Sequence, residues 1–296
     1  MKKVIVGDQS LKKFAQKLNW DFWLIKERRF PDTELQPLLL KEEKIKIAIL
    51  ILEKKEEETI NDYLIKFYLL SRKLKELANK VIGVVPYLPY ARQDKVFRVG
   101  EPLSSLYIAE LLENNLDFLI TFNMHEHRKM IDDIFSIPSY NLSLFKYLAL
   151  HFKDLKPENT IIIGPDKESK KFVNDFKTNF EAESYILHKT RNIKTGRVTF
   201  HEKKLPVVNK DIIIVDDIVS TGSTVKLVVG LLTKMQVRSI SLAFVHPVLG
   251  NQTIKELKKL NLRKIVTTNT INNNYYQVNY LDSLFEFIKE NKNLFT

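Results

Sequence analysis

Short apolar runs alternate with amphipathic segments along the chain. In the first half, four runs rich in Val, Ile and Phe predict strands at 4–6, 45–52, 81–85 and 118–122. Apolar residues recur at helical spacing between these runs, which predicts helices at 59–80 and 103–112. The second half continues in the same order, with predicted strands at 160–163, 184–187, 212–215 and 239–245 and helices at 169–180 and 224–235. This alternation predicts an α/β fold of mostly parallel sheets flanked by helices.

The stretch 136–139, which contains a proline, separates the two halves, and we place a domain boundary near Asn141. The prediction is an N-terminal domain at 1–141 and a C-terminal domain at 142–296. In open α/β sheets, ligands bind beyond the carboxyl ends of the strands. Residues that follow a predicted strand are therefore the candidates for a functional site.

Composition and charge narrow the class of protein. The 296 residues are 44% apolar and 28% charged, as in a soluble globular protein, and the longest apolar runs are too short to span a membrane. With no signal-like N-terminus, we expect a cytoplasmic protein with no membrane partner. The net charge of +11 leaves a nucleic-acid-binding protein open, but mixed-sign stretches such as 53–58 favour a solvated surface, and we expect no nucleic-acid partner. The absence of cysteine excludes disulfides and thiol chemistry.

The segment 211–225 carries the most specific chemistry. Its apolar run predicts a buried strand that stops at Asp216 and Asp217. Five small residues follow and open a predicted helix: Ser220, Thr221, Gly222, Ser223 and Thr224. Free N–H groups at a helix N-terminus bind phosphate, and adjacent acids accept hydrogen bonds from sugar hydroxyls. The segment therefore indicates a sugar-phosphate site, although an ordinary helix cap remains an alternative.

This segment resembles the phosphoribosyl-diphosphate motif of type I phosphoribosyltransferases and of ribose-phosphate diphosphokinases. Ser220 occupies a position where most members have an acid. A serine at this position is similar to the archaeal members. The resemblance implies two phosphoribosyltransferase-like domains with the site between them. It also implies that Asp216 and Asp217 orient the hydroxyls of ribose 5-phosphate while residues 220–224 hold its phosphate.

Two further segments resemble the diphosphokinases specifically. The stretch 85–102 resembles their Tyr-Ala-Arg-Gln-Asp and Gly-Glu-Pro signature, which phosphoribosyltransferases lack, and implies that Arg92, Gln93 and Asp94 bind ATP. The stretch 29–34 resembles their Phe-Pro-Asp-Gly-Glu element, which reaches ATP on a neighbouring subunit. It implies three more ATP-binding residues, Phe30, Asp32 and Glu34, and a homodimer or higher homo-oligomer.

One substitution in the second of these segments affects its expected shape. Thr33 occupies the position of the family glycine. Because a Cβ disfavours positive φ, we expect a differently shaped loop.

Lys189 and Arg191 match the family's catalytic Lys-x-Arg, in a polar and basic segment whose part at 195–198 resembles the archaeal form. The resemblance implies that both side chains stabilise the transferring diphosphoryl group. The alternative is a solvated basic hairpin.

His125 and Asp166 match residues that help to place Mg²⁺ in the family. Ser136 and Tyr140 stand where bacterial and eukaryotic members have acids of a regulatory metal site, and we expect that site to be absent. Asn123, Glu168 and Ser169 also depart from the family pattern, which makes catalytic metal binding a weaker expectation than sugar-phosphate binding.

The resemblance extends from about Phe30 to Ile271 in the same motif order. It implies a transferase of nucleotide biosynthesis, a ribose-phosphate diphosphokinase that converts MgATP and ribose 5-phosphate to 5-phosphoribosyl 1-diphosphate and AMP. A non-catalytic regulatory paralogue and a phosphoribosyltransferase that uses the product remain alternatives.

Overall fold

The computed structural model describes residues 2–55, 57–96, 98–126, 128–191, 198–200, 205–249 and 251–296. The chain divides into two compact units. Unit 1 comprises Met1–Leu142, Thr270–Asn272 and Tyr280–Thr296, and unit 2 comprises Ser143–Asn269 and Asn273–Asn279. No helix among the described residues is long and apolar enough to cross a membrane.

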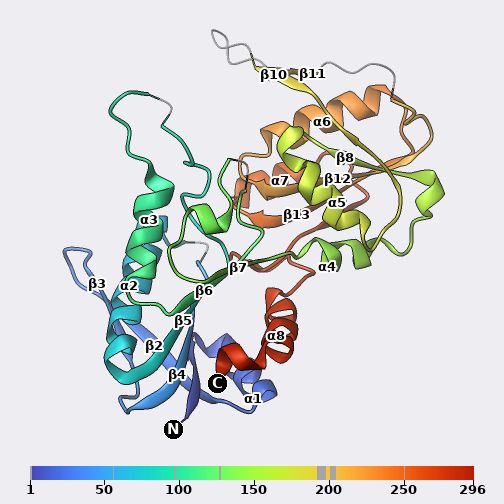
Figure 1. Cartoon of the computed structure of the whole chain (residues 1–296). Helices are drawn as coiled ribbons and strands as arrows, with labels where there is room; N and C mark the ends of the chain where they lie inside the picture. Colours follow the sequence, from blue (N-terminus) through green and yellow to red (C-terminus); the bar gives the residue numbers. More distant parts are fainter. Residues whose placement is uncertain are drawn as a thin grey trace. The chain divides into compact units, whose positions relative to one another are not determined.

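Unit 1 contains a seven-stranded sheet in the order β3-β2-β1-β4-β5-β6-β7 (Figure 1). Its strands are β1 (Lys3–Gly7), β2 (Asp21–Arg29), β3 (Leu35–Leu39), β4 (Ile45–Ile51), β5 (Ala78–Val85), β6 (Phe118–Phe122) and β7 (Ser139–Leu142). All neighbours are parallel except β2 and β3, which form an antiparallel hairpin. The hairpin was not predicted, because the second half of β2 is exposed and charged and so lacks an apolar pattern.

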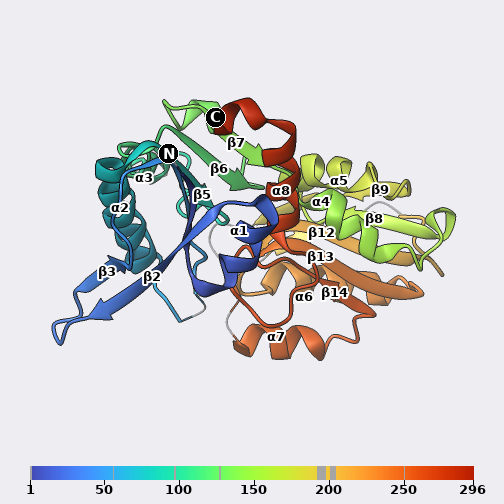
Figure 2. The same ribbon diagram turned by 90° about the horizontal axis from the view of Figure 1, so that it is seen from below.

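Helices cover both faces of the unit 1 sheet, as Figure 2 shows. They are α1 (Lys12–Leu18), α2 (Ile60–Leu77), α3 (Ser104–Glu113) and α8 (Tyr280–Glu290). The apolar sides of α2 and α3 pack with Val4, Val6 and Leu50 in one buried cluster. The amphipathic pattern that predicted both helices therefore corresponds to burial against the sheet.

Unit 2 contains a parallel five-stranded sheet in the order β14-β13-β12-β8-β9. Its strands are β8 (Thr160–Gly164), β9 (Glu183–Ile186), β12 (Asp211–Val219), β13 (Ser239–Pro247) and β14 (Lys264–Val266), and its helices are α4 (Phe145–Ala149), α5 (Lys170–Lys177), α6 (Ser223–Lys234) and α7 (Asn251–Lys258). On one face, α6 and α7 contribute Val228 and Leu257 to a cluster with Ile212. On the other, Phe145 of α4 stacks on Phe172 of α5, with ring centroids 5.2 Å apart.

Short elements complete the two units. A separate antiparallel pair is formed by β10 (Lys189–Arg191) and β11 (Val198–Phe200). Single 3-10 turns lie at Gln9–Leu11, Ile131–Asp133, Leu150–Phe152, Pro157–Asn159, Lys167–Ser169 and Lys292–Phe295.

The C-terminal segment corrects the predicted domain organisation. The sequence assigned all of 142–296 to the C-terminal domain, but Thr270–Asn272 and Tyr280–Thr296 belong to unit 1. The buried Tyr280 hydroxyl donates a hydrogen bond to Glu53 Oε1 at 2.8 Å, and the ring of Phe295 packs edge-on against Phe118. Burial of these aromatic side chains holds the end of the chain on the first sheet.

Candidate active site

Asp216 and Asp217 lie inside strand β12, not after it as the sequence predicted. The strand continues to Val219 because β13 provides backbone partners as far as Pro247. Strand β8, on the other side, pairs with β12 only up to Ile214. The two acids therefore lie beyond the last β8 pairing but remain fixed by β13.

The two carboxylates are held by backbone contacts at this edge. Asp217 is 5% exposed, while Asp216 is partly exposed. The Asp217 N–H donates to Asp216 Oδ1 at 3.0 Å, and the Ile218 N–H donates to Asp217 Oδ1 at 2.8 Å. These bonds orient the side chains before any ligand arrives.

Asp216 lies in an unfavourable electrostatic environment. Although part of the residue reaches solvent, desolvation of its carboxyl raises the pKa well above the ordinary value, and the negative charges of Asp217 and Asp166 raise that pKa further. Asp166 follows β8 and begins the turn Lys167–Ser169, where its side chain accepts a hydrogen bond from the Glu168 N–H at 3.1 Å. A cation or hydroxyl donors would relieve this environment.

The turn 220–224 joins β12 to α6. Gly222 is the residue before α6 and has φ of 68°, a left-handed conformation that favours glycine. A Cβ at this position would approach side-chain atoms of Thr253 and Leu257 at 3.1 and 3.3 Å, so α7 leaves little room for a side chain here. Thr221 and Ser223 are exposed, and their hydroxyl oxygens are 3.0 Å apart.

The N-terminus of α6 has the properties of an anion site. Gly222, the residue before the helix, provides no capping side chain, the Ser223 N–H donates a long hydrogen bond of 3.4 Å to Thr221 Oγ1, and no acid occupies the first turn. The N-terminus of α6 carries partial positive charge, and the hydroxyl side chains of Thr221, Ser223 and Thr224 are part of the same turn. The arrangement suits a phosphate group.

The loop 30–34 connects β2 to β3 in unit 1. The Phe30 N–H donates to the Glu34 carbonyl at 2.9 Å, and the Thr33 N–H donates to the Phe30 carbonyl at 2.9 Å. The Arg28 guanidinium lies 4.7 Å from the centre of the partly exposed Phe30 ring. Asp32 and Glu34 are exposed.

Thr33 corrects the expectation drawn from its Cβ. Its φ is 76°, so it adopts the conformation that the sequence predicted it would avoid. The Arg29 guanidinium donates to the Thr33 carbonyl at 2.8 Å, which helps to hold this conformation. A β-branched residue with positive φ is strained by about 1–3 kcal/mol, so surrounding contacts must stabilise the loop.

Arg92 and Gln93 are exposed on the loop after β5, whereas Asp94 is buried at 4% exposure. Arg128 donates to Asp94 Oδ1 at 2.8 Å, and the second oxygen, Oδ2, is buried and has no hydrogen-bond partner among the described residues. Asp94 therefore faces the interior, unlike its two neighbours. Its contacts indicate that it fixes the loop, which the sequence did not predict.

The predicted metal residues belong to different units. His125 follows β6 in unit 1 and is partly exposed, whereas Asp166 lies in unit 2. Among the described residues, no three His, Asp or Glu side chains form a group that could hold a metal ion. Ser169, an unusual residue relative to the family pattern, is fully buried and its hydroxyl bonds to the Asp166 carbonyl.

Lys189 and Arg191 lie on β10. Lys189 pairs with Phe200 and Arg191 with Val198 in an antiparallel ladder, which is the geometry of a hairpin. Residues 195–197 of the archaeal-like stretch lie outside the described residues.

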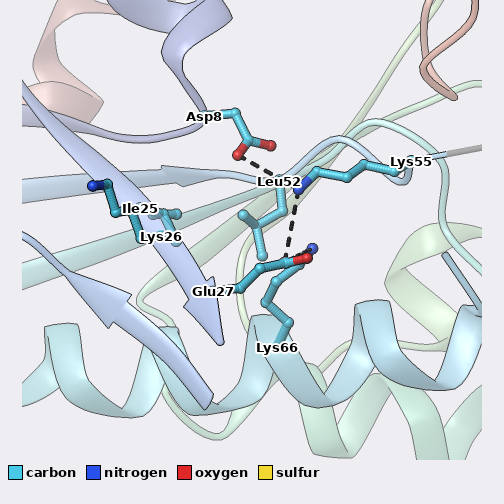
Figure 3. A pocket seen from close by; sticks show the side chains of 7 residues that line it. All are labelled: Asp8, Ile25, Lys26, Glu27, Leu52, Lys55 and Lys66. Atoms are coloured by element: carbon cyan, nitrogen blue, oxygen red, sulfur yellow. Dashed lines mark hydrogen bonds and ion pairs between the residues drawn. The ribbon is translucent and has the colours of Figure 1, made fainter. Parts of the chain in front are cut away.

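The structure also reveals a polar cavity that sequence reasoning missed. Its volume is 180 Å³, and it lies where β1 and β4 end (Figure 3). Its lining consists of Asp8, Ile25, Lys26, Glu27, Leu52, Lys55 and Lys66. The sequence contains one feature that could have indicated this cavity. Lys66 is a charged residue between Tyr63 and Phe67 on the apolar side of α2.

The fold and the β12–α6 turn define a protein of the phosphoribosyltransferase fold class. Residues 7–115 match the model of the N-terminal domain of ribose phosphate pyrophosphokinase, and residues 131–281 match that of the phosphoribosyl transferase domain. The chain belongs to the ribose-phosphate pyrophosphokinase family, which is the diphosphokinase family that the sequence resembles. Both this resemblance and the predicted fold class are confirmed.

Individual relatives agree with this assignment. A ribose-phosphate pyrophosphokinase of Methanobrevibacter smithii is 28% identical over 93% of this chain and 95% of its own length. One of Methanopyrus kandleri is 30% identical over 72% of each chain. The fold matches the crystal structure of phosphoribosylpyrophosphate synthetase from Mycobacterium smegmatis, with a TM-score of 0.83, 21% identity and 98% of both chains covered.

Proposed function

We propose that this protein is a ribose-phosphate diphosphokinase that converts ATP and ribose 5-phosphate to 5-phosphoribosyl 1-diphosphate and AMP. The oxygen of the anomeric hydroxyl attacks the β-phosphorus of ATP and loses its proton. The bond from the β-phosphorus to the oxygen that bridges it to the α-phosphorus breaks, and AMP leaves with that oxygen. The observation that carries the proposal is the pair Asp216 and Asp217 on the strand before α6, whose first turn has no acid, in a chain of this family.

Unit 2 would hold the sugar phosphate. The 5-phosphate binds the N–H groups and hydroxyls of residues 220–224, where the helix end has no negative side chain of its own. Ribose hydroxyls donate hydrogen bonds to Asp216 and Asp217. These donors would offset the burial and repulsion that raise the pKa of Asp216.

Unit 1 would contribute ATP-binding residues. The exposed Arg92 supplies a planar guanidinium for phosphate oxygens, and Gln93 supplies an amide for the base or sugar. Phe30 offers a ring for stacking on adenine, while Asp32 and Glu34 accept hydrogen bonds. Asp94 would support this loop through Arg128 instead of touching the nucleotide.

Lys189 and Arg191 would stabilise charge on the diphosphoryl group during transfer. Phosphoryl-type transfer depends mainly on alignment and charge stabilisation, so no strong general base is required.

We also propose Mg²⁺ as the cofactor, with His125 and Asp166 near it. An acid-rich edge provides the oxygen ligands that Mg²⁺ prefers, and Mg²⁺ commonly completes its coordination with water and substrate phosphates. When bound, the ion neutralises phosphate charge. The absence of a three-residue metal group among the described residues is compatible with this mode of binding.

The decisive experiment measures AMP and 5-phosphoribosyl 1-diphosphate by ion-exchange chromatography. The purified protein is incubated with ATP, Mg²⁺ and ribose 5-phosphate, and each component is omitted in turn. We expect equal amounts of the two products only in the complete mixture. AMP formation that does not depend on ribose 5-phosphate, or no AMP at all, would contradict the proposal.

The cellular context follows from the same proposal. A cytoplasmic homo-oligomer that provides an activated sugar for nucleotide biosynthesis fits the activity, with no membrane or nucleic-acid partner. Light scattering coupled to gel filtration tests the oligomeric state.

A further inference from the structure

A buried lysine occupies the sheet-facing side of α2. Lys66 is 2% exposed, although neighbouring positions on this side of the helix are apolar. Moving an ammonium group out of water costs several kcal/mol unless its charge is compensated by close partners. The position therefore requires an explanation in terms of what Lys66 contacts.

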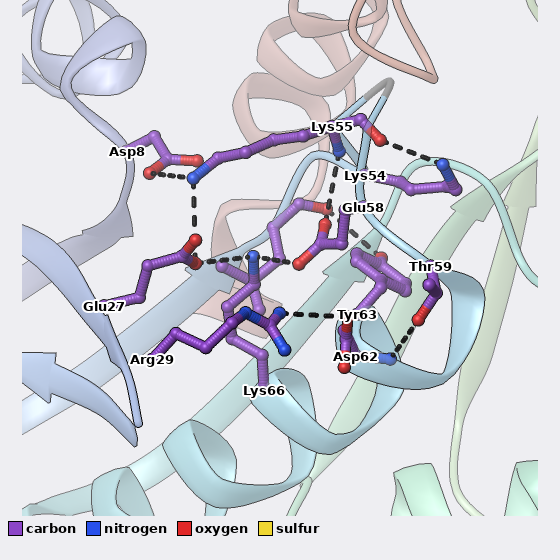
Figure 4. A network of polar contacts seen from close by, with 11 residues as sticks. Asp8, Glu27, Arg29, Lys54, Lys55, Glu58, Thr59, Asp62, Tyr63 and Lys66 are labelled. Atoms are coloured by element: carbon purple, nitrogen blue, oxygen red, sulfur yellow. Dashed lines mark hydrogen bonds and ion pairs between the residues drawn. The ribbon is translucent and has the colours of Figure 1, made fainter. Parts of the chain in front are cut away.

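Two carboxylates bind the Lys66 ammonium (Figure 4). Glu27 Oε2 is 3.2 Å from Lys66 Nζ, and Glu58 Oε1 also forms a hydrogen bond with it. Burial acts to lower the pKa of Lys66, but the bonds and charges of Glu58 and Glu27 dominate and raise it. Lys66 therefore remains a cation across the physiological pH range.

A second ion pair joins the same strand and helix. The Arg29 guanidinium donates to Asp62 Oδ2 at 3.0 Å. Glu27 and Arg29 are two residues apart on β2, so their side chains lie on the same face of the strand. Asp62 and Lys66 are four residues apart and therefore lie one turn apart on the same face of α2.

The spacing and the order of charge fit each other. Two strand residues span roughly 7 Å and one helical turn roughly 5–6 Å, so both pairs form at once. Each element presents one acid followed by one base on the side that faces the other element. The opposite charges meet only when the end of β2 lies beside the start of α2. If β2 slid along α2 or ran in the opposite direction, residues of like charge would face each other.

This double ion pair lies immediately before the loop 30–34. Arg29 bonds to Asp62 and also to the carbonyl of Thr33, whose φ is strained at 76°. Lys55 adds a weaker contact, because its Nζ is 3.7 Å from Glu27 Oε2 and 3.9 Å from Asp8 Oδ1. The contacts thus connect α2 directly to the conformation of the loop.

We infer that the pairs Glu27–Lys66 and Arg29–Asp62 form a positioning device that fixes the hairpin loop 30–34 for recognition of the ATP base. The inference rests on the proposed function, in which Phe30, Asp32 and Glu34 contact ATP. Lys66 acts through the loop and is a positioning residue. Glu27 and Lys66 of the first pair also line the adjacent cavity.

The test compares two lysine-to-methionine substitutions on α2. Lys66→Met removes the buried charge and keeps an apolar side chain of similar length. The matched control is Lys73→Met, because Lys73 is on the same helix but pairs with Glu42, outside the loop. Hydrogen exchange of the unliganded proteins reports on the loop amides, calorimetry gives the ATP affinity, and steady-state kinetics give KM for both substrates.

For Lys66→Met, we expect the Phe30 and Thr33 amides to exchange about tenfold faster and the Kd and KM for ATP to rise about tenfold, which corresponds to about 1.4 kcal/mol. The KM for ribose 5-phosphate should change less than about twofold, because unit 2 is expected to bind this substrate. Lys73→Met should match the wild type. If Lys66→Met fails to fold, Arg29→Gln at the more exposed pair should give the same pattern, with partial recovery in Arg29→Lys.

Unchanged amide exchange in the folded variants would overturn the positioning device. Faster exchange with unchanged ATP affinity would overturn its role in recognition of ATP. If the wild-type protein binds ATP but forms no AMP, only the proposed reaction is contradicted. The positioning device is still tested in that case, because amide exchange of the loop and ATP affinity can be measured without turnover.

Discussion

The carboxyl-end edges of the two sheets handle negative charge in opposite ways. In unit 1, Glu27 and Glu58 pair with the buried Lys66, so the charges of these two acids are compensated within the chain. In unit 2, the charges of the described residues that act most on Asp216 are those of Asp217 and Asp166, both negative. The comparison indicates that the first edge supports structure, whereas the second is prepared for a ligand that supplies hydroxyl donors or positive charge.

The helix that follows each edge shows the same contrast. In α2, the Thr59 side chain accepts a hydrogen bond from the Asp62 N–H at 3.0 Å, and Asp62 places a negative charge in the first turn. In α6, the Ser223 N–H makes only a long hydrogen bond of 3.4 Å to Thr221 Oγ1, and the first turn contains no acid. The N-terminus of α2 is thus satisfied within the chain, whereas the N-terminus of α6 has no negative side chain in its first turn to oppose the phosphate that we propose.

The largest effect should come from the basic residues of β10. Lys189→Ala and Arg191→Ala should each lower kcat by roughly 10²–10³-fold with little change in ATP affinity, because their contacts would strengthen in the transition state. Lys210→Ala is the control, since Lys210 bonds to the Glu158 carbonyl near the other end of the sheet. The measurement is kcat at saturating substrate concentrations. Equal kcat values in all three variants would show that Lys189 and Arg191 are not catalytic residues.

The contrast between the helix ends can be erased directly. Ser223→Asp gives α6 an acid in its first turn, as in α2, and should weaken ribose 5-phosphate binding by more than about tenfold through repulsion. Ser223→Asn, which is similar in size and uncharged, should bind considerably tighter than the aspartate variant. Calorimetric titration decides, and identical affinities for the two variants would argue against a phosphate at this turn.

A smaller loss is expected when an acid of the unit 2 edge is neutralised. Asp217→Asn should weaken ribose 5-phosphate binding by about tenfold, because one charged hydrogen-bond acceptor is lost. Asp8→Asn, at the compensated edge of unit 1, should leave this affinity unchanged. If both variants bind like the wild type in calorimetry, the two edges do not differ as we describe.

The smallest effect concerns stability. Burial and two acids raise the pKa of Asp216 in the folded state, so its contribution to stability is greatest at low pH and is lost as pH rises through the folded pKa. Asparagine cannot ionise, so Asp216→Asn should not lose stability as the pH rises. We expect the free energy of unfolding of this variant to exceed that of the wild type by about 1 kcal/mol near pH 8, with a smaller difference near pH 4. Urea unfolding at both pH values measures it. A variant that is less stable near pH 8 would show that the carboxylate is not electrostatically strained.

The sequence by itself determined the features that depend on contiguous residues. The apolar run 118–122 coincides with β6 because buried parallel strands need uninterrupted apolar side chains. The segment from Asp216 to Thr224 was recognisable because its acids, glycine and hydroxyls follow one another along the chain. The family resemblance depended on such local motifs and was confirmed.

Only the tertiary structure decided features that depend on distant partners. Strand β12 reaches Val219 because β13 pairs with it, and Tyr280 joins unit 1 because Glu53 accepts its hydroxyl. Thr33 keeps a positive φ with the help of a hydrogen bond from Arg29. Burial of Lys66 depends on the carboxylate of Glu27, which is 39 positions away in the chain but within hydrogen-bond distance in the structure. Local patterns specify periodicity and turn chemistry, whereas pairing between remote charges and backbone groups is specified only when the chain has folded.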